Sequence, residues 1–175
     1  MAIIRRKNKK KSPLQFEMAE DVLNFARQNN IKAVPLDIGA LMELMGIKII
    51  CSNTLPDNTS GILKETELGW VCEVNAKHHI TRQRFTLAHQ LAHYILHRDD
   101  ETKEFIDYAY LGKSINNNRI ELEANEFAIN LLMPKADFKY YIQNVSKDSD
   151  DVAKYFKVSP LAVRLKVNQL NYKII

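Results

Sequence analysis

Two histidines separated by three residues, His89 and His93, form the pattern in this sequence with the clearest chemical meaning. On an α-helix, side chains four positions apart lie one turn above each other on the same face. Both imidazole rings can therefore reach a single metal ion, provided that the segment is helical. Gln90 follows the first histidine, and its amide can form hydrogen bonds but cannot remove a proton from water.

The same spacing occurs in the His-Glu-x-x-His motif of zinc-dependent peptidases, in which the glutamate acts as the general base. Gln90 takes the place of that glutamate here. The sequence therefore predicts a metal site that is retained, with Zn2+ as the ion, and a catalytic base that is missing. Two histidines at this spacing are by themselves a weak signal, because a structural histidine pair is the more common explanation.

A catalytic zinc ion needs a third protein ligand and an open coordination position. Residues 118–133 are expected to form a helix that is stopped by Pro134. A helical wheel places Glu121 and Asn125 on its apolar face, whereas Glu123 falls on the opposite, solvent-facing side. A carboxylate that points into a core needs a positive partner. Glu121 is therefore the predicted third ligand.

Asn125, one turn after Glu121, has two interpretations. It can accept the outer N–H of a metal-bound histidine, or it can be a core amide that binds the backbone. His97 extends the histidine series, but each helical turn climbs about 5.4 Å, and three successive turns cannot comfortably reach one ion. We expect His97 to complete the end of the helix instead. The residue that stabilises an oxyanion is left open among His78, His79, Tyr94, Tyr108 and Tyr110.

The expected fold is α+β, mainly helical with a small antiparallel sheet. Apolar periodicity, caps and β-branched runs predict its elements. The expected helices are 14–28, 38–45, 81–97, 118–133, 136–143, 152–156 and 160–170, and the expected strands are 47–51, 61–64 and 70–74. The segment 99–118 is expected to be irregular. Ser159 and Pro160 are suited to begin the last helix, and the last two helices have helix-turn-helix spacing.

The chain has 175 residues, of which 46% are hydrophobic and 26% charged, a balance typical of a globular protein. Six positive charges lie within residues 5–11, so the rest of the chain carries −2 rather than the overall +4. We expect residues 1–12 to be a basic, disordered tail that could contact nucleic acid. The absence of a long apolar run or a signal-peptide pattern predicts a cytoplasmic protein without membrane contact.

Two segments together resemble one protein family. RFTLAHQLAHYILH (84–97) resembles the RFTLAHELGHxxLH signature of the ImmA/IrrE metallopeptidases, and ELEANEFAINLLMP (121–134) resembles that family's ExEANxFAxxLLMP segment. Ala92 replaces the usual glycine, a mild change that favours the helix. Gln90 replaces the catalytic glutamate, and this change removes the base.

The resemblance implies a zincin-like metallopeptidase core at residues 13–145 and a helix-turn-helix-like unit at 146–175. It places His89, His93 and Glu121 at the zinc-ligand positions. It also implies a cytoplasmic regulatory endopeptidase, because characterised relatives cleave helix-turn-helix repressors of mobile elements or stress regulons. Because the general base is replaced, we expect this chain to bind zinc but to cleave peptides slowly or not at all.

Two other functions are kept as alternatives. A chain without the base could hold a repressor without cutting it, as an anti-repressor or as one half of a toxin–antitoxin pair. The last unit could instead bind DNA through four polar residues of its final helix: Arg164, Lys166, Asn168 and Gln169. Phosphate would be repelled by the acidic residues that precede this helix, Asp148, Asp150 and Asp151. Protein recognition is therefore the favoured interpretation of this unit.

Overall fold

The computed structural model describes residues 16–99, 101–108 and 119–172. The predicted basic tail, Tyr110 and the predicted cap Asn118 lie outside these residues. The described elements follow one another as α1 (Ala19–Gln28), α2 (Ile38–Leu44), β1 (Ile47–Ser52), β2 (Thr59–Thr66), β3 (Gly69–Asn75), α3 (Ile80–Leu96), β4 (Glu104–Tyr108), α4 (Arg119–Leu132), α5 (Lys135–Asn144), α6 (Ser149–Phe156) and α7 (Pro160–Leu170). The α+β class is confirmed.

The four strands form one sheet in the order β1-β3-β2-β4. The predicted hairpin joins β2 to β3, and Gly69 adopts a φ of +109° at its turn. β2 pairs antiparallel with β3 and β4, whereas β3 runs parallel to β1. The sheet is therefore mixed rather than wholly antiparallel, because the hairpin turns β3 back into the space between β1 and β2.

The edge strand β4 lies in the segment that the sequence predicts to be irregular, and that prediction was wrong for these five residues. Phe105 and Asp107 are buried on the inner face, while the other three residues are exposed. Among the described strands, β4 pairs with β2 alone. Phe105, Ile106 and Tyr108 are β-forming residues, but a run of five residues within a polar segment is too short to stand out in the sequence.

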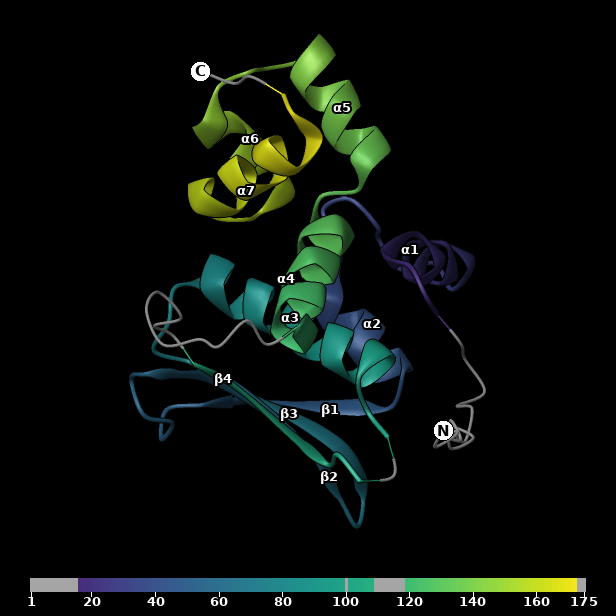
Figure 1. Cartoon of the computed structure of the whole chain (residues 1–175), viewed down its shortest axis with the longest axis vertical. Coiled ribbons are helices and arrows are strands. Elements are labelled where there is room, and N and C mark those ends of the chain that lie inside the picture. The colour runs from purple at the N-terminus through teal and green to yellow at the C-terminus, as the bar shows by residue number, and fades with distance from the viewer. Residues whose placement is uncertain (1–15, 100, 109–118, 173–175) are drawn as a thin grey trace, which may run out of the picture.

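Helix α3 packs on the inner face of the sheet, and α4 packs against α3. Figure 1 shows all the described helices on this one side of the sheet. Both helices bury alanines completely: Ala88 and Ala92 on α3, and Ala124 and Ala128 on α4. Small side chains at a helix contact allow the two axes to approach closely. This packing brings side chains of two separate helices to one place.

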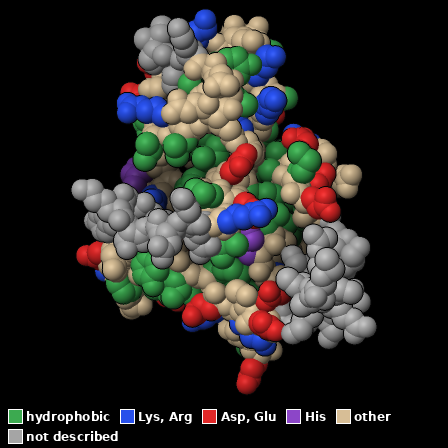
Figure 2. Space-filling model, viewed as in Figure 1, with side chains coloured by type: hydrophobic (Ala, Val, Ile, Leu, Met, Phe, Trp, Pro, Cys, Tyr) green, Lys and Arg blue, Asp and Glu red, His purple; other side chains and the backbone are tan. Residues whose placement is uncertain are grey.

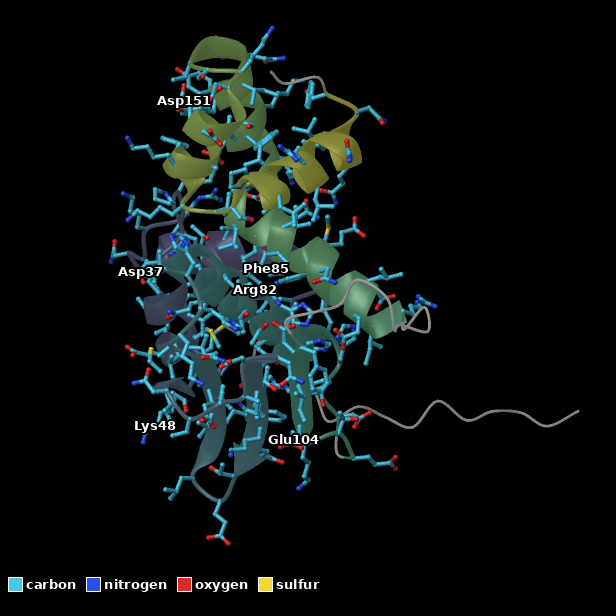
Figure 3. All side chains as sticks on the ribbon, turned by 90° about the vertical axis from the view of Figure 1, so that its left-hand side faces the viewer. Asp37, Lys48, Arg82, Phe85, Glu104 and Asp151 are labelled. Atoms are coloured by element: carbon cyan, nitrogen blue, oxygen red, sulfur yellow. The ribbon has the colours of Figure 1, made fainter. Side chains whose placement is uncertain are left out.

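The last three helices form a unit at the far end of the molecule from the sheet, as Asp151 and Glu104 mark in Figure 3. Its core includes Phe138 of α5 and Phe156 of α6, whose ring centroids are 5.8 Å apart. Ser159 caps α7 by accepting from the backbone N–H of Ala162, with Pro160 in the first turn. The predicted start of the last helix is confirmed.

Two of the four polar residues proposed for DNA contact face the protein instead. Lys166 is fully buried, and its Nζ donates to Asn130 Oδ1 of α4 at 2.6 Å. Gln169 Nε2 donates to Glu126 Oε1 of α4 at 3.0 Å. The helical wheel that places Glu123 on the solvent-facing side of α4 also places Glu126 and Asn130 there. It is wrong for these two residues because a wheel takes no account of a helix packed across that side.

Arg84 joins three parts of the chain. Its Nε donates to the carbonyl of Lys157, in the turn between α6 and α7, at 3.0 Å. Its Nη2 donates to the carbonyl of Leu36, just before α2, at 2.9 Å. Burial lowers the pKa of this guanidinium, and Asp37 nearby opposes the shift. The helix that carries His89 and His93 is therefore tied directly to the C-terminal unit.

Helix α3 passes close to the sheet at Gly61 of β2. A Cβ built on Gly61 would lie 2.6 Å from Thr86 Cγ2 and 2.8 Å from the carbonyl oxygen of Glu73. We predict that Gly61→Ala lowers the free energy of unfolding by about 1–3 kcal/mol through overpacking. Denaturant unfolding would measure this loss. Gly39→Ala is the control, because a Cβ there meets only Asp37 Oδ1 at 3.7 Å; equal losses in both variants would contradict the packing argument.

Burial gives Lys166 a measurable signature in the pH dependence of stability. Burial is the main cause that lowers its pKa from 10.5 to about 8, with a further contribution from Lys135. Between these two values the folded chain releases its proton before the unfolded chain does, so the free energy of unfolding rises with pH.

We predict that Lys166→Met abolishes this part of the rise without loss of stability at pH 7, as measured by denaturant unfolding at several pH values. Lys154→Met on the exposed side of α6 is the control and should retain it. A Lys166→Met variant with the parent's slope would show that the ammonium is solvated.

Candidate metal centre

Helix α3 presents His89 and His93 from its buried side. The exposed fraction of each histidine is 1%. Their Nε2 atoms are 3.0 Å apart. Phe85 stacks along the His89 ring, and Phe105 of β4 stacks on the His93 ring with centroids 4.6 Å apart. Aromatic contacts from the same helix and from the edge strand therefore hold the two rings in place.

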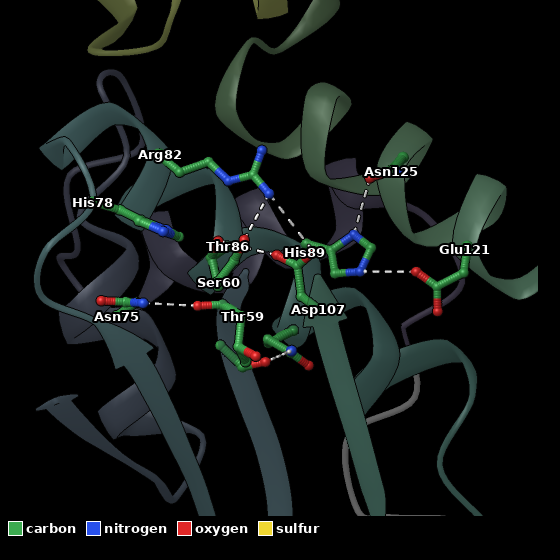
Figure 4. A network of polar contacts seen from close by, with 12 residues as sticks. Thr59, Ser60, Asn75, His78, Arg82, Thr86, His89, Asp107, Glu121 and Asn125 are labelled. Atoms are coloured by element: carbon green, nitrogen blue, oxygen red, sulfur yellow. Dashed lines mark hydrogen bonds and ion pairs between the residues drawn. The ribbon is translucent and has the colours of Figure 1, made fainter. Parts of the chain in front are cut away.

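Glu121, in the first turn of α4, points at both rings. Its Oε2 lies 3.3 Å from His89 Nε2, and its Oε1 lies 3.3 Å from His93 Nε2. One potential ligand atom from each of the three residues lies within 4.8 Å of the others. Figure 4 shows Glu121 reaching the His89 ring from the neighbouring helix. The structure thus brings together the three residues that the sequence predicts as ligands.

The charges of this cluster suit a cation. Partial burial opposes ionisation of Glu121, but the two adjacent imidazoles outweigh this and lower the pKa of the carboxyl. Burial also lowers the pKa of His93, although Glu121 opposes that shift. The ionised carboxylate therefore faces a His93 ring that resists protonation. Two imidazole nitrogens and a carboxylate oxygen are a donor set that Zn2+ accepts readily, so the residues fit such an ion.

Asn125 lies one turn beyond Glu121 and contacts His89. Its Oδ1 is 3.0 Å from His89 Nδ1, as Figure 4 shows. An amide oxygen accepts, so His89 carries its proton on Nδ1 and leaves the lone pair of Nε2 free. The Asn125 side chain therefore contacts an imidazole, as its first interpretation requires; the role as outer partner of a metal ligand stays a prediction.

Gln90 is completely buried beside β2. Its Nε2 donates to the carbonyl of Gly61 at 3.3 Å. Its Oε1 is buried and has no hydrogen-bond partner among the described residues. A buried amide oxygen without a partner costs free energy unless a donor meets it. The position predicted for the general base is therefore occupied by a group that can accept one hydrogen bond but cannot accept a proton.

The helical wheel predicts that Glu123 faces solvent, but its side chain also contacts the end of α3. Its Oε2 lies 3.3 Å from His97 Nε2, and its Oε1 accepts from Arg119 Nε at 2.6 Å. His97 ends α3 as its C-cap, as the sequence predicts. Its Nδ1 also lies 3.1 Å from His93 Nδ1. The i,i+4 spacing of the two histidines was the signal that could have revealed this contact.

The four described candidates for oxyanion stabilisation lie outside the histidine cluster. His79 caps α3 by accepting from the N–H of Thr81. His78 Nε2 contacts the carbonyl of Asp57 at 3.2 Å. Tyr94 packs edge-on against Trp70, and Tyr108 is exposed on β4. None of these four residues contacts His89, His93 or Glu121 in the described part of the chain.

A buried polar network lies on the inner face of the sheet. It could not be predicted from the sequence, because it depends on where β4 pairs. Asp107 is 3% exposed and accepts from Thr86 Oγ1 of α3 at 3.1 Å. Arg82 Nη2 donates to Ser60 Oγ of β2 at 2.6 Å and lies 3.9 Å from Asp107. Figure 4 shows this network on the same helix as His89. It fixes α3 to β2 and β4.

The surface carries no large field of one charge on the face that Figure 2 shows, where acidic, basic and apolar side chains of the described residues alternate. No described helix is both long enough and apolar enough to span a bilayer.

Comparison with known proteins adds to this geometry. No functionally curated protein matches the sequence. A transcriptional regulator of Mycobacterium tuberculosis has a similar fold, with a TM-score of 0.61 and 20% identity over 85% of this chain. The chain spans only 45% of that regulator. The Peptidase M78 family model, the IrrE N-terminal-like domain, matches residues 42–168, a range that holds both histidines, Glu121 and most of the C-terminal unit. The chain therefore belongs to the Peptidase M78 family of IrrE N-terminal-like domains.

Proposed function

We propose that this chain is a zinc-binding regulatory endopeptidase of its family, held in an inactive or nearly inactive form by Gln90. The observation that carries the proposal is the convergence of His89, His93 and Glu121 from two helices onto a single point. Membership of a metallopeptidase family supports a metal at that point. Zn2+ is the proposed ion because its preferred ligands are present in the number that leaves one position open.

When bound, zinc would polarise a peptide carbonyl and lower the pKa of a water molecule. The residues of this chain supply the remaining functions. Asn125 orients His89, and Phe105 supports the ring of His93. Gln90, whose amide nitrogen is held by Gly61, offers only its oxygen to a donor. No group at this position can therefore accept the water proton or deliver it to the leaving amine.

We propose a helix-turn-helix repressor of a mobile element or stress regulon as the protein substrate, and the cytoplasm as its place of action. The resemblance of residues 84–134 to the ImmA/IrrE peptidases supports this choice. The structurally similar protein is itself a transcriptional regulator. Direct contact with nucleic acid is a weaker proposal, because the buried Lys166 and the engaged Gln169 are not available for it.

A binding function without cleavage is the second candidate, and the hydrogen bond that Gln90 donates to Gly61 favours it. The amide is buried and already donates to a backbone carbonyl. A glutamate in the same position would place a carboxylate oxygen against that carbonyl, which repels it. The pocket therefore suits an amide, as expected of an anti-repressor or a toxin–antitoxin protein that holds its partner intact.

We predict that the purified chain binds about one zinc ion and that His89→Ala abolishes this binding, because one of three ligands is lost. Metal analysis after chelator-free purification, together with competition against a chromophoric chelator, would measure both. His79→Asn is the matched control: it removes a histidine outside the cluster and keeps a residue that caps helices well. Equal zinc content in parent and His89→Ala would exclude the proposed site.

We further predict that Gln90→Glu accelerates cleavage of the partner repressor by about 10²–10⁴-fold, the usual contribution of a general base. Incubation of the zinc-loaded variant with a repressor encoded beside its gene should give a discrete product, detected by mass spectrometry. A double variant with His89→Ala should give none. If Gln90→Glu binds zinc and repressor but leaves the repressor intact, the second candidate is correct.

A further inference from the structure

His93 has a second ring nitrogen that faces away from the metal cluster. This atom, Nδ1, lies 3.1 Å from Nδ1 of His97. One of the two nitrogens must donate and the other accept, because two lone pairs or two protons at this distance would repel. The pair by itself does not decide which ring carries the proton.

Glu123 decides the direction of the proton. Its Oε2 lies 3.3 Å from Nε2 of His97, and an ionised carboxylate only accepts. Nε2 of His97 is therefore protonated, and in the neutral ring Nδ1 carries a lone pair. That lone pair accepts the Nδ1–H of His93. The second oxygen of Glu123 accepts from Arg119 at 2.6 Å, which helps to hold the carboxylate toward His97.

We propose that His97 and Glu123 are positioning residues that fix His93 in the tautomer with its proton on Nδ1 and so present the Nε2 lone pair to the metal. The inference rests on the proposed zinc site. His97 cannot itself be a ligand in this arrangement, because both of its nitrogens are engaged. Its side chain is 7% exposed, so the ring is a fixed part of the interior. The two metal-binding histidines therefore have different outer partners: the neutral amide of Asn125 for His89, and a carboxylate acting through an imidazole for His93.

The pair His97→Leu and His97→Asn tests this proposal. Leucine fills the space but accepts no hydrogen bond, whereas asparagine retains an acceptor at the position of the lost Nδ1. We expect His97→Leu to weaken zinc affinity by about 10–100-fold, the usual effect of removing an outer partner. His97→Asn should recover most of that affinity. Chelator competition would measure the affinities, and Leu96→Ala, one position earlier on α3, is the control for a general loss of stability.

A second measurement does not depend on any variant. Nitrogen-15 NMR of the zinc-loaded parent should show His93 bound through Nε2 and protonated on Nδ1, and His97 protonated on Nε2. Coordination of zinc through Nδ1 of His93, or a His97 protonated on Nδ1, would overturn the proposal. A parent that binds zinc with the same affinity as His97→Leu would overturn it while leaving the zinc site intact. A parent that binds no zinc would overturn the zinc site and this inference with it.

Discussion

The contact between α3 and α4 is the constraint on which the candidate centre depends. Each helix alone carries an incomplete ligand set, because two imidazoles or one carboxylate hold a divalent cation weakly. Buried alanines on both helices let the backbones approach, and Glu121 then reaches both Nε2 atoms at 3.3 Å. The contact sets an ionised carboxylate against two buried rings, a place where a positive ion would be stabilised.

The sheet supports that contact from the opposite side. Asp107 and Arg82 fasten α3 to the strands through buried polar bonds, and Phe105 lies flat against His93. Such bonds are directional, so they fix how far α3 is rotated about its axis as well as its distance from the sheet. The direction in which the two histidines point is therefore set by β2 and β4, although neither strand supplies a ligand.

Local sequence predicted the features that depend on one helix at a time. The spacing of His89 and His93, the inward side of Glu121 and the cap at Ser159 follow from helical periodicity and from capping chemistry. The features that were missed involve two elements at once. β4 takes its place at the edge of the sheet by pairing with β2, and Lys166 contacts α4 across the helix interface. Glu123 was assigned to solvent because the wheel did not include the end of α3.

The tie made by Arg84 determines which substitutions would break the link between α3 and the C-terminal unit. Both of its hydrogen bonds end on backbone carbonyls, at Leu36 and at Lys157. Every amino acid offers the same carbonyl, so substitutions at those two positions leave the tie in place as long as the backbone keeps its path. Position 157 adopts a left-handed φ of 54°, which asparagine or glycine tolerates well. A substitution at position 36 or 157 is therefore expected to keep the tie, whereas a substitution of Arg84 removes both of its hydrogen bonds.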